Sequence, residues 1–325
     1  MVNKQYIVVD NLNTSSSTSL RVAQKVKDYF QLMKFTLSFT VVFSCVICYL
    51  LAPNVQVNNI DTVIKVIELF IAGMLVTGSA NAINQAVEKD TDALMKRTAK
   101  RPVAAGRMTQ DEAYIFAAIA GVIGVVMMYR VFNMSSALLS AFSLFLYAFI
   151  YTPLKKVNSI AVLVGALPGA LPCLIGWVAA TNIINPYGVF EVNGNIFSNG
   201  AGWVLFAIQF LWQFPHFWAI AWVAHSDYSK AGFKLLPADK GPTRFTAIQA
   251  VMYSVLMIPV GILPYLFHIS GQVSLWIVLA CNIGMVVQSL RLYKDMNVKA
   301  ARRVMFSSYI YLPVVLLALL ADKMN

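Results

Sequence analysis

Long apolar runs alternate with short polar segments along most of the chain. A transmembrane helix needs on the order of 20 apolar residues to cross about 30 Å of hydrocarbon. Runs of that length recur throughout, so the pattern predicts an all-α membrane protein with nine transmembrane helices. These helices cover roughly residues 34–52, 65–87, 111–130, 135–151, 158–181, 200–224, 243–268, 272–291 and 303–321.

The amino-terminal 33 residues do not share this pattern. They are polar and include the low-complexity stretch NTSSSTS. They have neither the apolar core of a signal peptide nor the composition of an Arg-rich transit peptide. We therefore expect residues 1–33 to form a cytoplasmic tail and residues 34–325 to form one membrane domain. This tail favours a bacterial plasma membrane over a mitochondrial inner membrane.

Composition and charge agree with this topology. The chain is 59% hydrophobic and only 12% charged, which is too apolar for a soluble protein of 325 residues. With the amino terminus in the cytoplasm, 22 of the 25 Lys and Arg residues fall on the cytoplasmic side. The net charge of +11 is thus explained by membrane topology. No basic soluble face remains that would indicate a nucleic-acid partner.

Three chemically unusual segments end spans that run in the same direction. With a cytoplasmic amino terminus, the second, fourth and sixth spans all end at the cytoplasmic face. Those ends carry NAINQAVEKDTDALMKRTAKRP (81–102), YTPLKK (151–156) and WQFPHFWAIAWVAHSDY (212–228). We therefore expect these segments to lie at one end of the helical bundle.

The first segment has the spacing of a metal site. Asn84, Glu88 and Asp92 recur every fourth residue, which places their oxygen atoms along one stripe of a continuous helix. Asp90 lies off this stripe. Each ionised group within a span costs roughly 2.5–3.5 kcal/mol, and adjacent carboxylates repel unless a cation neutralises them. Such oxygen ligands suit Mg²⁺, which commonly combines one or two carboxylates with phosphate oxygens.

Basic residues follow the carboxylates within a turn or two, at Lys96, Arg97, Lys100 and Arg101. Because the Arg guanidinium matches phosphate oxygens with two parallel hydrogen bonds, the combination predicts a site for a metal diphosphate. For the basic residues alone, an ordinary positive-inside loop is the simpler interpretation.

These motifs, in this order, resemble the UbiA-type intramembrane prenyltransferases. Asn-x-x-x-Glu-x-x-x-Asp at the end of the second helix, followed by MKRTAKRPVAAGR, is similar to the first aspartate-rich motif of that family. EKDTDALMKRT, YTPLKK, GALPGALPCLIGW, WQFPHFWAIAW and AGFKLLP are closely similar to its haem-prenylating branch. The similarity extends over nearly all nine predicted helices.

The resemblance implies a nine-helix bundle with a central cavity in which the farnesyl group of farnesyl diphosphate is transferred to the 2-vinyl group of haem B. Water is added in the same reaction, and Mg²⁺ assists departure of the diphosphate. Membrane lipid, and haem A synthase or the assembly of a terminal oxidase, are the further partners it suggests. By position in the motifs, it implies metal binding by Asn84, Glu88, Asp92 and Asp90, and diphosphate binding by Arg97, Arg101, Lys155 and Lys156.

Two positions depart from the wider family pattern. His216 stands where many relatives have the first acid of a second aspartate-rich motif, which is expected in the haem-directed branch. We expect a catalytic role for His216, by orienting a haem propionate, ligating iron or another metal, or transferring a proton; a hydrogen-bonded packing residue is the alternative. Beside Lys34, Phe35 and Thr36 replace the Pro and Arg that the family often has.

The four cysteines lie within predicted spans. Cys45 and Cys48 have a metal-motif spacing, but on an apolar helix we expect them, with Cys173 and Cys281, to be small packing residues.

Three alternative functions remain from the sequence. One is a UbiA-type prenyltransferase with another aromatic or tetrapyrrole acceptor, against which His216 and GFKLLP argue. A secondary transporter would place its charges mid-span in paired halves, whereas these concentrate at one face. An assembly factor without enzymatic activity gives no reason for a stripe of carboxylates.

Overall fold

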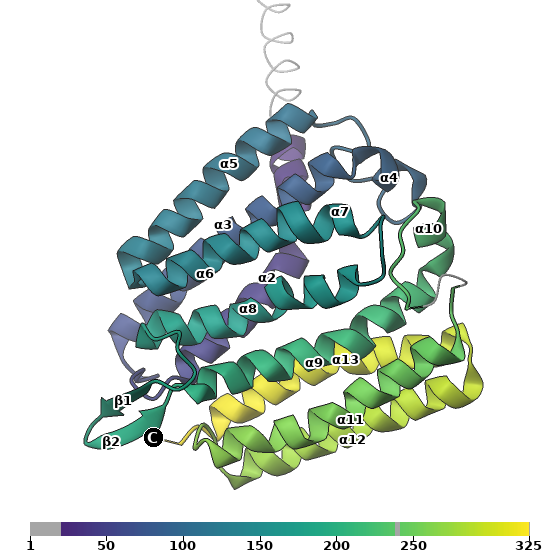
Figure 1. The fold of residues 1–325 in the computed structure, drawn as a ribbon. Helices are drawn as coiled ribbons and strands as arrows, with labels where there is room; N and C mark the ends of the chain where they lie inside the picture. The colour runs from purple at the N-terminus through teal and green to yellow at the C-terminus, as the bar shows by residue number, and fades with distance from the viewer. Residues whose placement is uncertain (1–20, 238–240, 325) are drawn as a thin grey trace, which may run out of the picture.

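The computed structural model describes residues 21–237 and 241–324 and is helical apart from one β-hairpin (Figure 1). Eight described helices are long and apolar enough to cross a membrane, and the bent pair Arg21–Leu32 and Phe35–Leu51 makes up to nine. This confirms the predicted all-α multi-pass architecture. The long helices are α2 (Phe35–Leu51), α3 (Ile60–Val87), α5 (Gln110–Met127), α6 (Met134–Phe145), α8 (Ala161–Thr181), α9 (Gly200–Val223), α11 (Arg244–Leu266), α12 (Gln272–Asp295) and α13 (Val298–Ala321).

Short elements continue or connect these helices. The π-helical segments η1 (Met128–Phe132) and η2 (Leu146–Tyr151) extend α5 and α6, and π-helical turns often mark functional sites. The remaining elements are α4 (Lys89–Leu94), α7 (Thr152–Leu154), α10 (His225–Lys230), β1 (Val189–Val192) and β2 (Asn195–Ser198).

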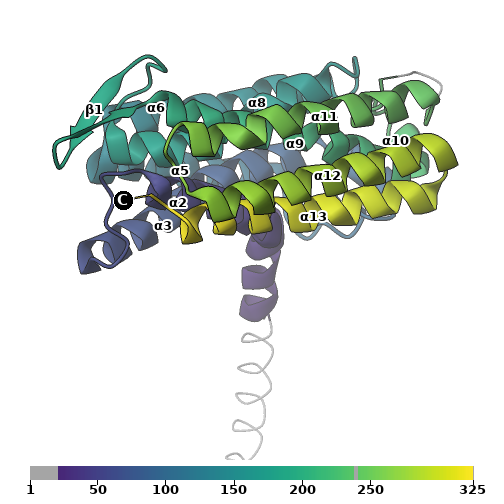
Figure 2. The ribbon, with the colours of Figure 1, turned by 90° about the horizontal axis from the view of Figure 1, so that it is seen from below.

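Consecutive long helices pack as neighbours, and α13 returns to α2 so that the bundle closes. Figures 1 and 2 show α4 and α10 at one end of the bundle and the hairpin with the carboxyl terminus at the other. We call these the charged end and the hairpin end. The cytoplasmic location of the charged end, and of the amino terminus, stays a prediction.

Residues 21–32, which the sequence analysis assigned to a polar tail, form a helix that turns by 49° into α2. Leu32 is fully buried in a cluster with α3 and α5. On the same face of this helix, Asp28 accepts a hydrogen bond of 2.9 Å from Arg107 and Lys25 forms an ion pair of 2.7 Å with Glu112. The part of the predicted tail before residue 21 lies outside the described residues.

Helix α8 is closely packed, as its GALPGALP sequence predicts. A side chain at Gly165 would meet the Tyr151 ring, so only glycine permits this approach. Pro172 has no N–H to donate to the Pro168 carbonyl, which instead accepts a hydrogen bond of 3.3 Å from Ser143.

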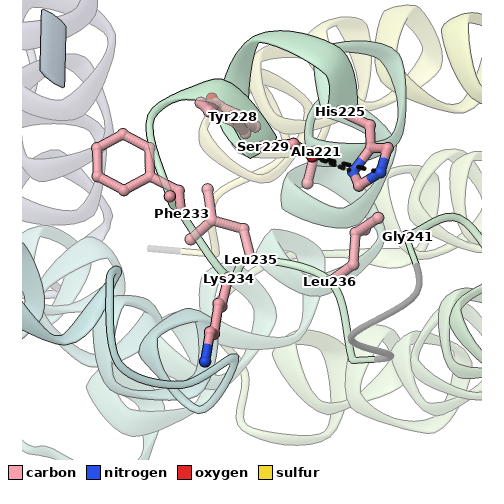
Figure 3. Close-up of a pocket in the computed structure, with 10 residues that line it drawn as sticks. Ala221, His225, Tyr228, Ser229, Phe233, Lys234, Leu235, Leu236 and Gly241 are labelled. Atoms are coloured by element: carbon pink, nitrogen blue, oxygen red, sulfur yellow. Dashed lines mark hydrogen bonds between the residues drawn. The ribbon is translucent and has the colours of Figure 1, made fainter.

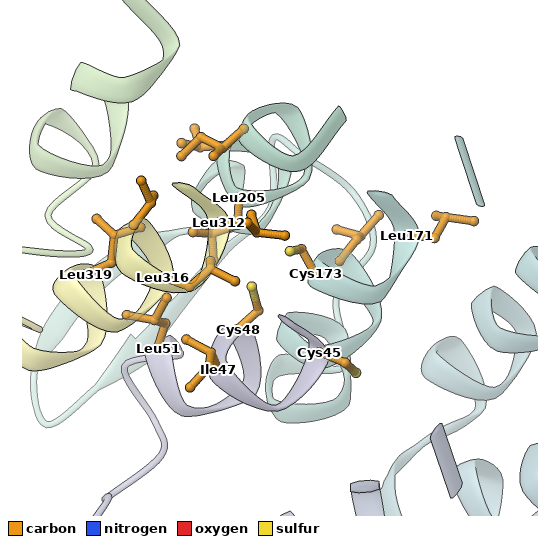
Figure 4. Close-up of a cluster of buried hydrophobic side chains, with 14 of the residues drawn as sticks. Cys45, Ile47, Cys48, Leu51, Leu171, Cys173, Leu205, Leu312, Leu316 and Leu319 are labelled. Carbon is orange, nitrogen blue, oxygen red and sulfur yellow. The ribbon is translucent and has the colours of Figure 1, made fainter. Parts of the chain in front are cut away.

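The cysteines belong to the apolar core between α2, α8, α9 and α13 (Figure 4). Cys45, Cys48 and Cys173 are buried there as free thiols, and the half-buried Cys281 packs against the same cluster. This confirms the predicted packing role.

The segment between α8 and α9, which the sequence analysis left between two predicted spans, contains a hairpin that it missed. Strands β1 and β2 are antiparallel, with Val192 opposite Asn195. Asn193 and Gly194 form the turn with φ of 53° and 83°, as a two-residue hairpin turn requires. The Asn-Gly pair between apolar residues was the available signal.

Candidate active site

The three segments expected to share one end do meet there. The main-chain N–H of Lys234, after α10, donates a hydrogen bond of 2.8 Å to the carbonyl of Lys155, after α7. Arg97, after α4, donates one of 3.2 Å to the hydroxyl of Tyr228 in α10. Lys155 also lies over the ring of Phe233, with its Nζ 5.5 Å from the centroid. The ends of α3, α6 and α9 are thus in direct contact.

Helix α3 does not run straight through the acidic motif. It ends at Val87, and Glu88 departs from helical geometry at φ −93° and ψ 12° before α4 begins. The hydrogen-bond pattern survives the break, since Glu88 N–H donates to Asn84 O at 3.0 Å and Asp92 N–H to Glu88 O at 2.7 Å. The three side chains therefore keep the common stripe that their spacing predicted.

Burial separates these three residues from the fourth acid. Asn84, Glu88 and Asp92 are 1%, 4% and 0% exposed. Asp90 is exposed, as expected for a residue off the stripe, and it makes none of the contacts that join the others. A role for Asp90 as a metal ligand stays a prediction.

Each buried oxygen-bearing side chain faces one cation. Lys155 Nζ lies 2.5 Å from Glu88 Oε1. Arg101 Nη1 donates to both oxygens of Asp92, at 2.7 and 2.9 Å.

The third cation is Lys34, whose Nζ donates a hydrogen bond of 2.7 Å to Asn84 Oδ1. Lys34 lies at the bend before α2 in a left-handed conformation with φ of 48°. The sequence analysis noted this lysine only as a retained motif position and did not include it in the site. No sequence signal linked it to Asn84, because the contact spans 50 positions and depends on how the bend meets α3.

Two of the basic residues predicted to bind diphosphate are exposed and lie outside the buried cluster. Arg97 is exposed and has its guanidinium carbon 5.7 Å from the centroid of the Tyr228 ring. Lys156 is exposed beside the buried Lys155. Roles for Arg97, Arg101, Lys155 and Lys156 in binding diphosphate stay predictions, but only Arg101 and Lys155 contact the buried carboxylates.

The cluster has an excess of positive charge. Two carboxylates meet three cations, and burial lowers the pKa of Lys155, while Glu88 acts in the opposite direction. Glu88 Oε1 is paired with the Lys155 ammonium and has no other partner among the described residues. An incompletely satisfied buried oxygen is available to a further cation, and the three basic groups are available to an anion.

The metal-binding capacity of the cluster is limited. Among the described residues, no group of three or more His, Cys, Asp or Glu side chains is arranged to hold a metal ion. The Asn84 amide oxygen and the two carboxylates are a donor set that suits Mg²⁺ when a substrate supplies further oxygens. The residues present therefore fit Mg²⁺ bound together with a diphosphate.

A pocket of about 240 Å³ opens beside this cluster, at the end of α9 (Figure 3). Its lining combines the apolar Ala221 and Leu235 with His225, Tyr228 and Lys234. The pocket lies at the charged end, and the central cavity that the resemblance implies stays a prediction.

His216 lies on α9 and is 9% exposed. Its Nδ1 is 2.8 Å from the Ser308 hydroxyl of α13, and the Trp212 ring stacks on it at 4.6 Å between centroids. The rings of Tyr309 and His216 are arranged edge to face, with 5.3 Å between their centroids. His216 thus lies among aromatic residues and is not part of the ion-pair cluster; its catalytic role stays a prediction.

Comparison with known proteins agrees with this fold. The pattern of the UbiA prenyltransferase family matches residues 41–311, so the chain belongs to that family. It is 45% identical to the protoheme IX farnesyltransferase of Cytophaga hutchinsonii, over 93% of this chain and 99% of the relative. It is 39% identical to the protein of the same name from Flavobacterium johnsoniae, over 96% and 99%. The sequence-based resemblance is therefore confirmed.

Solved structures support the same architecture. A digeranylgeranylglyceryl phosphate synthase superposes with a TM-score of 0.72 at 21% identity, covering 92% of this chain and 98% of the other. A UbiA homologue from Archaeoglobus fulgidus bound to GPP and Mg²⁺ gives 0.59 at 13% identity, covering 90% and 99%. At these identities the similarity concerns the fold alone.

Proposed function

We propose that this protein transfers the farnesyl group of farnesyl diphosphate to the 2-vinyl group of haem B, with addition of water, to give haem O and diphosphate. The full-length identity to protoheme IX farnesyltransferases supports the substrates. The observation that carries the proposal is the buried cluster of two carboxylates, one amide and three cations at the charged end.

Asn84, Glu88 and Asp92 would hold Mg²⁺, as their buried oxygens allow and as the Mg²⁺ of the Archaeoglobus homologue supports. The ion supplies neutralisation of the charge that develops on the departing diphosphate. Arg101 and Lys155 bind the same diphosphate, and each exchanges a carboxylate partner for phosphate oxygens.

The reaction breaks the bond between C1 of the farnesyl group and oxygen, with the electron pair leaving on the diphosphate. The 2-vinyl group of haem then attacks the allylic cation at C1. Water adds to the cation that forms next to the porphyrin and releases a proton, which completes the hydroxyethylfarnesyl substituent. Aromatic rings stabilise such cations, and Tyr151 and Phe233 already border the cluster at Lys155.

The direct test is to incubate the purified protein in detergent with haem B, farnesyl diphosphate and Mg²⁺. We expect haem O, identified by mass, and loss of the product after chelation with restoration by added Mg²⁺. Prenylation of an aromatic quinone precursor in place of haem would favour the alternative acceptor class. Turnover that persists unchanged after exhaustive chelation would contradict the assigned role of the acidic motif.

As the bacterial relatives suggest, we place the protein in a bacterial plasma membrane. An association with haem A synthase or with terminal oxidase assembly remains a prediction of the sequence.

A further inference from the structure

The ring of His216 is held in one orientation by α9 and α13. Trp212 stacks on one face with 23° between the ring planes, and Tyr309 approaches edge-on. Trp212 is itself fixed, because its indole N–H donates a hydrogen bond of 2.9 Å to the main-chain carbonyl of Ser308. The residue that fixes the Trp212 ring thus also contacts the imidazole.

The Ser308 hydroxyl determines which imidazole nitrogen carries the proton. A hydroxyl has one proton, and Ser308 Oγ lies 2.6 Å from the carbonyl of Met305 and donates to it. Ser308 Oγ must therefore accept at its 2.8 Å contact with His216 Nδ1. In the neutral imidazole the proton is consequently on Nδ1, and Nε2 bears a free lone pair.

No residue in the described part of the chain donates a hydrogen bond to that lone pair. His216 makes its one side-chain hydrogen bond there through Nδ1. Nε2 therefore has no hydrogen-bond partner among the described residues. A neutral histidine that donates through Nδ1 and presents an open Nε2 has the arrangement of a metal-ligating histidine.

The surroundings of Nε2 suit a flat aromatic ligand near the diphosphate site. Trp212 and Tyr309 border the imidazole. Helix α9, which carries His216, is followed directly by α10, whose Tyr228 accepts a hydrogen bond of 3.2 Å from Arg97 next to the acidic motif.

We propose that His216 Nε2 ligates the iron of the haem acceptor and that Ser308 is the positioning residue that keeps Nδ1 protonated. This rests on the proposed function. Ligation fixes the porphyrin relative to the charged end, so that a vinyl group is presented to the prenyl carbon. Loss of the Ser308 acceptor should weaken haem binding about 10- to 100-fold, as is typical when a partner of a metal-ligating histidine is removed.

The test is haem binding by the full-length protein without farnesyl diphosphate, followed by resonance Raman spectroscopy of the ferrous complex. We expect an iron–histidine band that His216→Ala abolishes and that added imidazole restores. Ser308→Ala should lower the frequency of this band, because Nδ1 loses its hydrogen-bond acceptor, and Ser308→Thr should keep it. Ser140→Ala is the matched control, since its buried hydroxyl bonds only the Ser136 carbonyl and should leave the band unchanged.

The outcomes separate this inference from the proposed function. If the wild type makes haem O but its spectrum does not depend on His216, the ligand assignment is overturned and the function stands. If the band depends on His216 but Ser308→Ala leaves it unshifted, the role of Ser308 is overturned. If the band behaves as expected and no haem O forms, the haem site is supported and the proposed reaction fails.

Discussion

Lys155 is buried at the charged end of the bundle, and Lys323 is half-buried at the hairpin end. The two ammonium groups have different partners. At the hairpin end, Lys323 Nζ donates three hydrogen bonds of 2.8 Å, to the carbonyls of Leu50, Ala52 and Val55. At the charged end, Lys155 pairs with the Glu88 carboxylate and lies over two aromatic rings. Among the described residues, the Lys323 ammonium thus has all three donors satisfied, whereas that of Lys155 has one polar partner.

This difference favours the charged end as the place of the proposed reaction. The carbonyls that Lys323 binds belong to the last turn of α2 and the loop after it, where carbonyls have no partner within a helix. That contact joins the carboxyl-terminal segment to α2 and has no reason to open. In the proposed reaction, the cations at the charged end exchange their carboxylates for an arriving metal diphosphate.

The largest effect that this comparison predicts comes from Asp92. Asp92→Asn keeps the shape of the side chain and removes its charge, so the affinity for Mg²⁺ and the stabilisation of the leaving diphosphate both fall. We expect haem O formation to decrease by about 100-fold or more. The rate should be measured on protein that elutes as a single species in detergent, because the Arg101 partner is also lost.

Asp111→Asn is the matched control, since Asp111 is exposed in the first turn of α5 and outside the acidic motif. We expect near-wild-type turnover. An equal loss in both variants would show that general charge near the membrane, and not the buried stripe, drives the reaction.

The second effect concerns Lys34, which the structure adds to the site. Lys34→Ala removes the donor to Asn84 and one of three cations, so we expect kcat/KM for farnesyl diphosphate to fall by about 10- to 100-fold. Lys34→Arg should restore part of the loss because the charge is retained.

Lys25→Ala serves as the control for Lys34. Lys25 lies in the helix before the bend at Lys34 and pairs with Glu112 near the surface, where ion pairs contribute about 1 kcal/mol or less. If Lys25→Ala lowers turnover as much as Lys34→Ala does, long-range charge explains both, and Lys34 is not a site residue.

The sequence predicted those parts of the site that depend on local periodicity. The interval of four residues placed Asn84, Glu88 and Asp92 on one buried face and left Asp90 outside it. The orientation of the spans, derived from basic residues, predicted that three distant segments would meet at one end. Both inferences use rules that act within one helix or on one span at a time.

The remaining features depend on contacts between distant helices. The partnership of Lys34 with Asn84 requires the 49° bend before α2, and that of His216 with Ser308 spans 92 positions. The residues involved give no periodic signal, because a single Lys or Ser on an apolar helix is compatible with many neighbours. Their pairing is set by the packing of the whole bundle.

The smallest effect on activity is expected at the hairpin end, where a variant of Lys323 tests directly whether the two ends differ in function. Lys323→Met keeps the apolar stem and removes the ammonium, so three carbonyls lose this donor, although Ala52 O still accepts from the Val55 N–H. We expect this to destabilise the fold by about 1–3 kcal/mol, seen as a lower midpoint of thermal unfolding in detergent. Below that midpoint, haem O formation should be unchanged, and the exposed Lys294→Met should alter neither quantity. A loss of turnover in Lys323→Met without a loss of stability would mean that the fully satisfied lysine also serves the reaction, and the number of satisfied donors would then not distinguish the two ends.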